Sequence, residues 1–309
     1  MQNGERSCFP PRYRAFRTIW PSCGPLRLAV DLSSKIEFVN VSDTGRKRPH
    51  NEDSSITDPE IGLALVADGM GGYKAGEVAS AIAAKAVLDT VRGDVSLPSS
   101  TKSADADGDS SLSVEALLVR DSIVDANSHI YRTATEVPQC QGMGTTIVAV
   151  YFHDNTAIIA HVGDSRVYRF RDDDLSQITN DHSLVQELID RGFFTPEEAE
   201  ANTPKNLVTR ALGIDATVEV DVMQEVTKPG DIYLLCSDGL NDMVDDEEIR
   251  LTLSKYSGNL AEAAHELVRL ANESGGKDNI SVVLARPRAP FPATAGMISK
   301  LINLITRRG

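Results

Sequence analysis

The sequence predicts an α+β fold in which helices pack on an antiparallel sheet or sandwich. Two observations support this prediction: segments with strand patterns follow one another in groups, and segments with helical periodicity occur in pairs. The strict alternation of strand and helix that indicates a parallel sheet is absent. With 309 residues, 41% of them hydrophobic, the chain is long enough to bury a large core.

The first predicted elements are two strands followed by two helices. Alternating residues predict a strand over 36–41, and the apolar run at 61–67 predicts a buried strand. An Ala-rich periodic segment predicts a helix over 77–91. Residues 93–113 are rich in Ser, Asp and Gly and predict a loop, after which a helix is expected over 114–135.

Three strands are expected next, at 145–151, 156–162 and 166–170. Residues 183–191 look helical. Thr195-Pro-Glu-Glu198 is typical of a helix start, with Thr as the cap and Pro at the first helical position. The remaining predicted elements complete the body of the chain: strands at 218–226, 232–236 and 280–285, and helices at 247–254 and 260–274.

The charge distribution divides the chain into three parts. Residues 1–34 carry a net +3 and residues 286–309 a net +5, so the overall −14 leaves −22 for the body between them. We therefore predict a flexible basic extension over 1–34, one domain over 35–286 and a tail over 287–309. An acidic body argues against a nucleic acid as the partner.

The tail begins as a Pro-rich linker and ends in a segment with helical periodicity. Its apolar residues fall on one stripe: Met297, Ile298, Leu301, Ile302 and Ile305. Lys300, Arg307 and Arg308 add positive charge around that stripe. Such a helix suits an anionic membrane surface, a partner protein or its own domain, and the residues leave these three readings open.

Cysteine use and hydropathy favour the cytoplasm. Only Cys140 and Cys236 lie in the body, in unrelated contexts, which argues against a disulfide framework. Apolar runs such as 61–67 are too short to span a bilayer, and the N-terminus lacks the apolar region of a signal peptide. A reducing compartment is therefore expected.

Several carboxylates share one setting, at the ends or starts of predicted strands and near glycine: Asp68, Asp164, Asp238 and Asp278. A single Asp-Gly pair at a strand end is more often only a turn. Four such positions are more informative, because the strand ends of one sheet can converge. Glu52 and Asp53 add two carboxylates just after the first strand.

A convergent carboxylate cluster repels itself unless cations lie in it. All-oxygen ligation favours Mg²⁺ or Mn²⁺ over zinc, and the chain has no His-x-x-x-His or Cys-x-x-Cys pair. Two such ions about 4 Å apart bridge a water, lower its pKa and clamp a phosphoryl oxygen during in-line attack. Arg48 is near Glu52 in sequence and is able to grip a phosphate bidentately, although a lone loop arginine is more often a solvated charge.

Seven stretches of the body resemble, in order and spacing, the metal-dependent serine/threonine protein phosphatases of the PPM (type 2C) family, specifically its bacterial branch. They are Ser42-Asp-Thr-Gly-Arg-Lys-Arg-Pro-His-Asn-Glu-Asp53, Val66-Ala-Asp-Gly-Met-Gly-Gly72, Gly142-Met-Gly-Thr-Thr146, His161-Val-Gly-Asp-Ser-Arg166, Thr179-Asn-Asp-His182, Cys236-Ser-Asp-Gly239 and Gly276-Lys-Asp-Asn279. Each stretch is weakly specific alone, but together they are very specific. They span about residues 36–285.

The resemblance implies a central β-sandwich flanked by pairs of helices, with two Mn²⁺ or Mg²⁺ ions at one end. It implies that Asp68 bridges both ions and that Gly69 offers its carbonyl to one of them. Asp238 and Asp278 are implied to complete the ligands of the first ion. Glu52 and Asp53 are implied to hold or position waters bound to the metals. Asp164, with Asp238, matches a site for a third ion. Arg48 matches the phosphate-binding arginine, and residues 184–208 match a mobile flap that shapes substrate access.

One position departs from the animal enzymes of the family. They carry a histidine, proposed as the general acid, where this chain has Met70, and a thioether cannot donate a proton. The bacterial branch shares this feature, so activity is still expected. The leaving-group acid is left unassigned, with a metal-bound water as the first candidate and His50 as the second.

The resemblance implies hydrolysis of phosphoserine and phosphothreonine in proteins by direct attack of water, in opposition to Hanks-type kinases. A basic apolar tail looks like that of members associated with type VI secretion, which would make a forkhead-associated scaffold protein a partner. Two alternatives are a catalytically inactive binding or sensing module on the same fold and a small-molecule phosphatase. Inactive members lose ligands, whereas Asp53, Asp68, Asp238, Asp278 and Arg48 are all present here.

Overall fold

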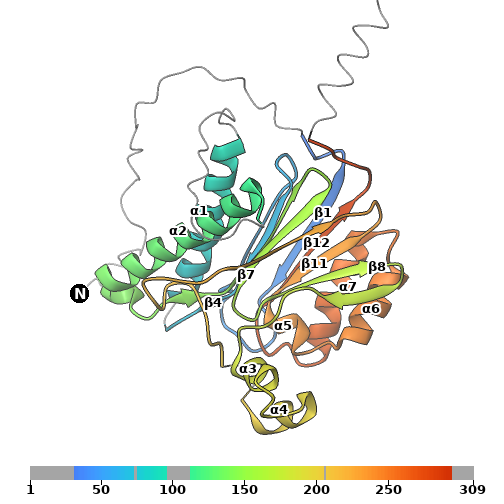
Figure 1. Ribbon diagram of the computed structural model, residues 1–309. Helices are drawn as coiled ribbons and strands as arrows, with labels where there is room; N and C mark the ends of the chain where they lie inside the picture. The colour runs from blue at the N-terminus through green and yellow to red at the C-terminus, as the bar shows by residue number, and fades with distance from the viewer. Residues whose placement is uncertain (1–30, 73–74, 96–111, 205–206, 294–309) are drawn as a thin grey trace, which may run out of the picture.

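The computed structural model describes residues 31–72, 75–95, 112–204 and 207–293. Two five-stranded antiparallel sheets face each other between two layers of helices (Figure 1). The α+β prediction and the antiparallel sandwich are therefore confirmed. The predicted extension over 1–34 is described only from residue 31, and the predicted helix within the tail lies outside the described residues.

The first sheet has the order β1-β12-β11-β8-β9 and the second the order β10-β7-β6-β3-β2. The strands of the first sheet are β1 (Ile36–Asp43), β12 (Ile280–Pro287), β11 (Ile232–Cys236), β8 (Arg166–Arg171) and β9 (Asp174–Gln177). Those of the second are β10 (Asp221–Val226), β7 (Thr156–Val162), β6 (Ile147–His153), β3 (Leu63–Ala67) and β2 (Ser54–Asp58). A short ribbon joins β4 (Gly69–Met70) to β5 (Gly144–Thr145).

Paired helices cover the outer face of each sheet. Helices α1 (Ala75–Val95) and α2 (Val114–Glu136) pack on the second sheet, and α6 (Asp246–Lys255) and α7 (Leu260–Glu273) pack on the first. The shorter helices lie in connections: a 3₁₀ turn (Pro138–Cys140), α3 (Leu184–Asp190), α4 (Pro196–Asn202) and α5 (Asp238–Asn241). Figure 1 shows α3 and α4 projecting from the body as a separate lobe.

Successive side chains of a central strand point to opposite faces of its sheet. The sheet can therefore pack against helices on one face and against the other sheet on the opposite face. Along β3, Leu63 and Leu65 face α1 and α2, whereas Ala64 and Val66 face the opposite sheet. All four side chains are fully buried. Such a strand reads as a continuous apolar run because both of its faces are covered. Burial of apolar surface on both faces contributes about 25 cal/mol per Å² and holds the sandwich together.

The structure differs from the sequence-based prediction at several boundaries. Helix α1 continues through Gly93 to Val95, where a loop was predicted. In its last turn Arg92 donates to the buried Asp58 on β2 at 2.9 Å. Strands β2 and β9 and helix α5 were not predicted. Strand β10 begins at Asp221, three residues later than predicted. The helix start at Thr195 is confirmed as a capping box with Glu198.

None of the helices in the described part of the chain combines the length and the hydropathy needed to cross a bilayer.

Candidate metal centre

The four strand-end aspartates come from both sheets and meet at one end of the sandwich. Asp68 connects β3 to β4, and Asp164 follows β7 after one glycine. Asp238 opens α5 directly after β11, and Asp278 lies two residues before β12. Because β3 and β12 contact each other across the sandwich, their ends bring residues distant in sequence together.

Electrostatic effects show that these carboxylates converge. Burial raises the pKa of Asp68 well above its usual range, and the charges of four further carboxylates add to the rise: Asp53, Asp238, Asp164 and Asp278. Burial, followed by the charges of Asp164 and Asp278, raises the pKa of Asp238. These mutual effects agree with the predicted acidic cluster, and the role of its members as metal ligands stays a prediction.

Two carboxylate oxygens in the cluster are buried without a hydrogen-bond partner among the described residues: Asp53 Oδ1 and Asp238 Oδ1. An ionised carboxylate buried without a donor is costly, and such oxygens are normally paired or bound to a metal. The charges of Asp53 and Asp238 both raise the pKa of Asp68, so the three carboxylates are near neighbours. This arrangement fits a site for hard divalent cations.

Asp53 is aimed at the cluster by two serines. Ser237 Oγ and Ser281 Oγ donate to Asp53 Oδ2 at 2.8 and 2.7 Å. Ser281 Oγ also lies 2.9 Å from Ser42 Oγ on the neighbouring strand β1. Because both serines donate to Oδ2, Oδ1 remains available to a cation or to a water bound to it. The sequence carries no signal for this serine support, because the three residues come from distant segments.

Glu52 is brought to the same place by its backbone. Glu52 N donates to Asn279 Oδ1 at 2.8 Å, and the amide of Asn279 donates to the carbonyls of Thr44 and His50 at 2.9 Å each. Asn279 thereby ties the loop after β1 to the turn that carries Asp278. Burial raises the pKa of Glu52, while the charge of Arg48 opposes that rise.

Gly69 has room for no side chain. A Cβ at this position would lie 2.2 Å from the carbonyl oxygen of Gly76 and 2.5 Å from that of Glu52. The backbone of β4 therefore approaches helix α1 and the loop that carries Glu52 closely. Such an approach suits a backbone carbonyl that serves as a ligand, as the resemblance implies for Gly69.

Arg48 lies at the mouth of the cluster. Its Nη2 donates to Asp278 Oδ2 at 2.5 Å, and about half of its side chain is exposed. This hydrogen bond, together with the charges of Asp278, Asp238 and Asp68, raises the pKa of Arg48. A guanidinium that is both accessible and next to the carboxylates can bind an anion that enters from solvent.

Asp164 lies on the side of the cluster near Asp238. Burial and the charge of Asp181 raise the pKa of Asp164 to about 6, and Asp242 contributes further. The charge of Asp242 also raises the pKa of Asp238. Sequence reasoning missed Asp242. The available signal was its position four residues after Asp238, which places both side chains on one face of a helical turn.

A second group able to hold a metal lies beside the cluster. His161, His182 and Asp221 each offer one ligand atom, and these atoms lie within 4.8 Å of one another. However, Arg210 Nη1 donates to Asp221 Oδ1 at 2.7 Å and supplies the positive charge there. His182 Nδ1 accepts from Gly163 N at 3.1 Å. The two imidazoles also stack with centroids 4.6 Å apart, so their in-plane lone pairs do not converge on one point.

The comparisons with known proteins agree with this geometry. A family model described as protein phosphatase 2C matches residues 47–284. The serine/threonine protein phosphatase PstP of Mycobacterium tuberculosis is 42% identical over 253 residues, which are 81% of this chain and 45% of that protein. The serine/threonine phosphatase stp of Listeria monocytogenes is 38% identical over 246 residues, 79% of this chain and 92% of that protein. This chain thus matches less than half the length of PstP.

Solved structures give the same result. The Mycobacterium tuberculosis PstP structure superposes with a TM-score of 0.71 at 37% identity, over 82% of this chain and 100% of that one. The catalytic domain of PstP in complex with two manganese ions gives 0.68 at 38% identity, over 82% and 98%. PppA, described as a key regulatory component of T6SS in Pseudomonas aeruginosa, superposes with a TM-score of 0.66 at 32% sequence identity, over 82% of this chain and 97% of that one. The chain belongs to the protein phosphatase 2C family.

Proposed function

We propose that the chain is a serine/threonine protein phosphatase that hydrolyses phosphoserine and phosphothreonine with the help of two Mn²⁺ or Mg²⁺ ions. The observation that supports this most strongly is the pair of buried, unpartnered oxygens, Asp53 Oδ1 and Asp238 Oδ1, within a cluster of carboxylates. Relatives named as serine/threonine phosphatases support the substrate class. The structure of PstP with two manganese ions supports the metal.

The residues proposed to hold the ions divide by position. Asp68 would contact both ions, Gly69 would offer its carbonyl, and Asp238 and Asp278 would complete the ligands of one ion. Glu52 and Asp53 would hold waters on them. Asp164, together with Asp238, would hold a third ion. When bound, the ions supply a water of lowered pKa and positive charge for the phosphoryl oxygens.

The remaining side chains of the site would orient the substrate. Arg48 is ion-paired to Asp278 and would exchange part of this contact for two oxygens of the phosphate. Met70 cannot donate a proton, and His50 is exposed on the loop after β1. We therefore propose that solvent at the site, rather than a side chain, protonates the leaving alkoxide.

We propose that the physiological substrates are phosphoproteins of a Hanks-type kinase in the cytoplasm. The likeness to PppA supports a role in type VI secretion. For that role we propose a forkhead-associated scaffold protein as the partner. Residues 35–286 would form the catalytic domain, and residues 184–208 the flap that shapes substrate access. The tail 287–309 would contact a membrane surface or a partner protein.

The test is phosphate release from a phosphothreonine peptide with Mn²⁺ and with EDTA. Wild-type turnover should require the metal, and Asp238→Asn should abolish it. Asp125→Asn, an exposed position on α2, is the matched control and should behave as wild type. Absence of turnover in every metal, with folded and metal-bound protein, would instead support an inactive binding module.

A further inference from the structure

The two ends of the flap, residues 184–208, are joined at its base. Thr209 N donates to the carbonyl of His182 at 2.8 Å, and Leu184 N donates to that of Leu207 at 2.9 Å. The flap therefore leaves and re-enters the body at one place. His182 is the last residue but one before α3 and is buried in this base.

His182 is bound to the residue that precedes Asp164. Gly163 N donates to His182 Nδ1 at 3.1 Å, and His182 N donates to the carbonyl of Gly163 at 3.0 Å. Gly163 has φ +109°, a conformation that favours glycine. The imidazole and backbone of His182 thus fix both polar groups of Gly163, and with them the direction in which the chain enters Asp164.

Gly163 also packs against Thr146, whose backbone and side chain bind the backbone of Asp68. A Cβ on Gly163 would lie 2.6 Å from the side chain of Thr146. Thr146 N donates to the carbonyl of Asp68 at 2.9 Å, and Asp68 N donates to Thr146 Oγ1 at 3.1 Å. Direct contacts therefore lead from His182 through Gly163 to the backbones of both Asp164 and Asp68.

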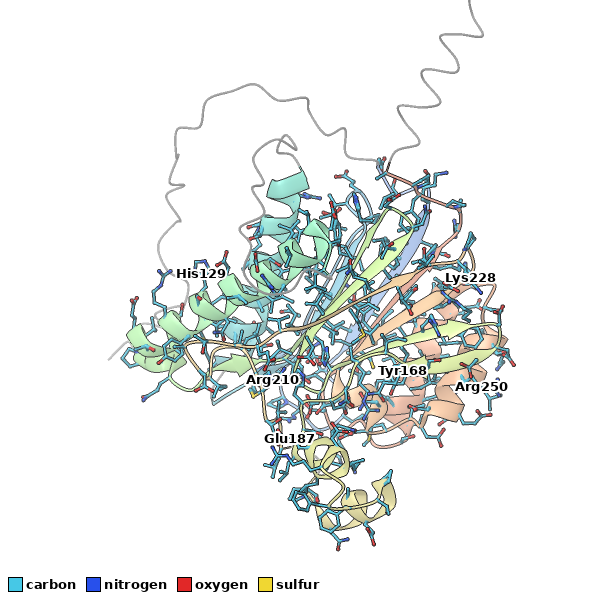
Figure 2. The ribbon with its side chains drawn as sticks, viewed as in Figure 1. His129, Tyr168, Glu187, Arg210, Lys228 and Arg250 are labelled. Atoms are coloured by element: carbon cyan, nitrogen blue, oxygen red, sulfur yellow. The ribbon has the colours of Figure 1, made fainter. Side chains whose placement is uncertain are left out.

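The other ring nitrogen of His182 faces the flap side. Nε2 lies 3.1 Å from Arg210 Nη1 and 3.4 Å from Asp221 Oδ2. Asp221 also accepts from Arg210, which follows the flap and lies between the body and the helix that carries Glu187 (Figure 2). Burial and the neighbouring His161 and Arg210 lower the pKa of His182 to about 4, so the ring is neutral near pH 7.

We propose that His182 is a positioning residue that sets Asp164 relative to Asp68 and links this setting to the base of the flap through Asp221 and Arg210. The inference rests on the proposed function, because it assumes that Asp164 binds a cation. His182 does not touch the cluster itself. Its loss should weaken the Asp164 site while the two ions proposed at Asp68, Asp238 and Asp278 stay bound.

Two substitutions of His182 distinguish the roles of its two ring nitrogens. In His182→Asn, the amide oxygen can replace Nδ1 as the acceptor for Gly163. In His182→Gln, the amide reaches toward Asp221 instead and leaves Gly163 N without its acceptor. Equilibrium dialysis against Mn²⁺ measures how many ions each protein binds and how tightly. Thermal unfolding shows whether each variant is folded.

Wild type should bind two ions tightly and a third more weakly. His182→Gln should weaken only the third, by the roughly 10- to 100-fold typical of residues that orient metal ligands, and His182→Asn should remain close to wild type. If His182→Gln fails to fold, Asp221→Asn, whose side chain is 40% exposed, tests the same link and should weaken the third ion in the same direction.

Three outcomes would each overturn the positioning role. The third ion binds equally well to wild type and His182→Gln, the two His182 variants lose affinity for it equally, or wild type binds no third ion. Phosphopeptide turnover is measured on the same samples. Wild type that binds the ions in the expected order but releases no phosphate would contradict the proposed function and leave the positioning role supported.

Discussion

Arg48 and Asp278 form an ion pair in which the proposed phosphate-binding group contacts a proposed metal ligand at 2.5 Å. The two residues lie 230 positions apart and come from the loop after β1 and the turn before β12. A cation at Asp278 would compete with the guanidinium for the same carboxylate. Metal binding would then free Arg48 to take up phosphate, which would link metal and substrate binding.

Replacement of Arg48 by alanine should raise KM for a phosphopeptide about 10- to 100-fold, since a hydrogen bond to a charged group contributes about 1.5–3 kcal/mol. Arg48→Lys should fall between alanine and wild type because lysine cannot bind two oxygens at once. Unfolding should change little, because the ion pair is half exposed. Steady-state kinetics check this, with Arg46→Ala on the same loop as control; an unchanged KM in Arg48→Ala would contradict the assignment.

The metal-free protein should lose stability as pH rises from about 4 to about 8. Asp53, Asp68, Asp164 and Asp238 all have raised pKa values in the folded chain, at about 6 for Asp164 and about 8 for Asp238. Unfolding returns them to about 4, so the folded state binds more protons in this range and the free energy of unfolding falls with pH. Below the unfolded pKa the contribution is fully present. The lowered pKa of His182 acts in the opposite direction between about 4 and 6.5 and offsets only part of it.

Thermal unfolding in EDTA at pH 5 and pH 8 measures this slope. For a chain of this length, each 1 kcal/mol lost lowers Tm by about 2–4 °C. Mn²⁺ should restore Tm at pH 8, because bound cations replace the protons. Asp238→Asn should flatten the slope. A Tm in EDTA that rises between pH 5 and pH 8 would show that the carboxylates do not converge.

Ser281→Ala should raise the Mn²⁺ concentration needed for half-maximal activity by about 10-fold, the lower end of the range for residues that orient a ligand. The hydroxyl donates to Asp53 Oδ2 at 2.7 Å and lowers the pKa of Asp53. Its removal leaves Asp53 harder to ionise and freer to rotate. A Mn²⁺ activation curve identical to that of the control Ser128→Ala on α2 would exclude this role.

The acidic body predicts a preference for phosphopeptides with basic flanking residues. Residues 35–285 carry a net charge of −22, and complementary charge accelerates association more than it strengthens binding. Matched phosphothreonine peptides with Lys or Glu at the flanking positions should differ in kcat/KM. The difference should shrink at high salt. Equal kcat/KM values at low salt would argue against electrostatic selection.

The sequence predicted the central elements of the fold because their patterns are strong. Residues 61–67 read as a buried strand, and β3 is covered on both faces. Strands β2 and β9 were missed because each lies at the edge of its sheet and is polar, as in Asp174-Leu-Ser-Gln177. An edge strand needs only one partner and little apolar surface, so it leaves no clear pattern.

The sequence predicted the carboxylates of the candidate site but not the residues that position them. Aspartates near glycine at the ends and starts of strands identified the cluster, and the charges of these residues act on one another in the structure. Ser281 lies in no recognisable pattern. Ser237 and His182 lie in stretches that resemble the family, but their supporting roles depend on contacts between segments far apart in the chain. Such supports become visible only when the fold places them against Asp53 and Gly163.

The most direct test of the account is the Mn²⁺ stoichiometry of wild type and Asp68→Asn, measured by equilibrium dialysis near neutral pH. The charges of Asp53 and Asp238 both act on Asp68, and Asp68 is the residue proposed to hold two ions at once. Wild type and Asp125→Asn should each bind at least two ions tightly, and Asp68→Asn should lose both while remaining folded. Tight binding of two ions by Asp68→Asn would contradict a centre built on this residue.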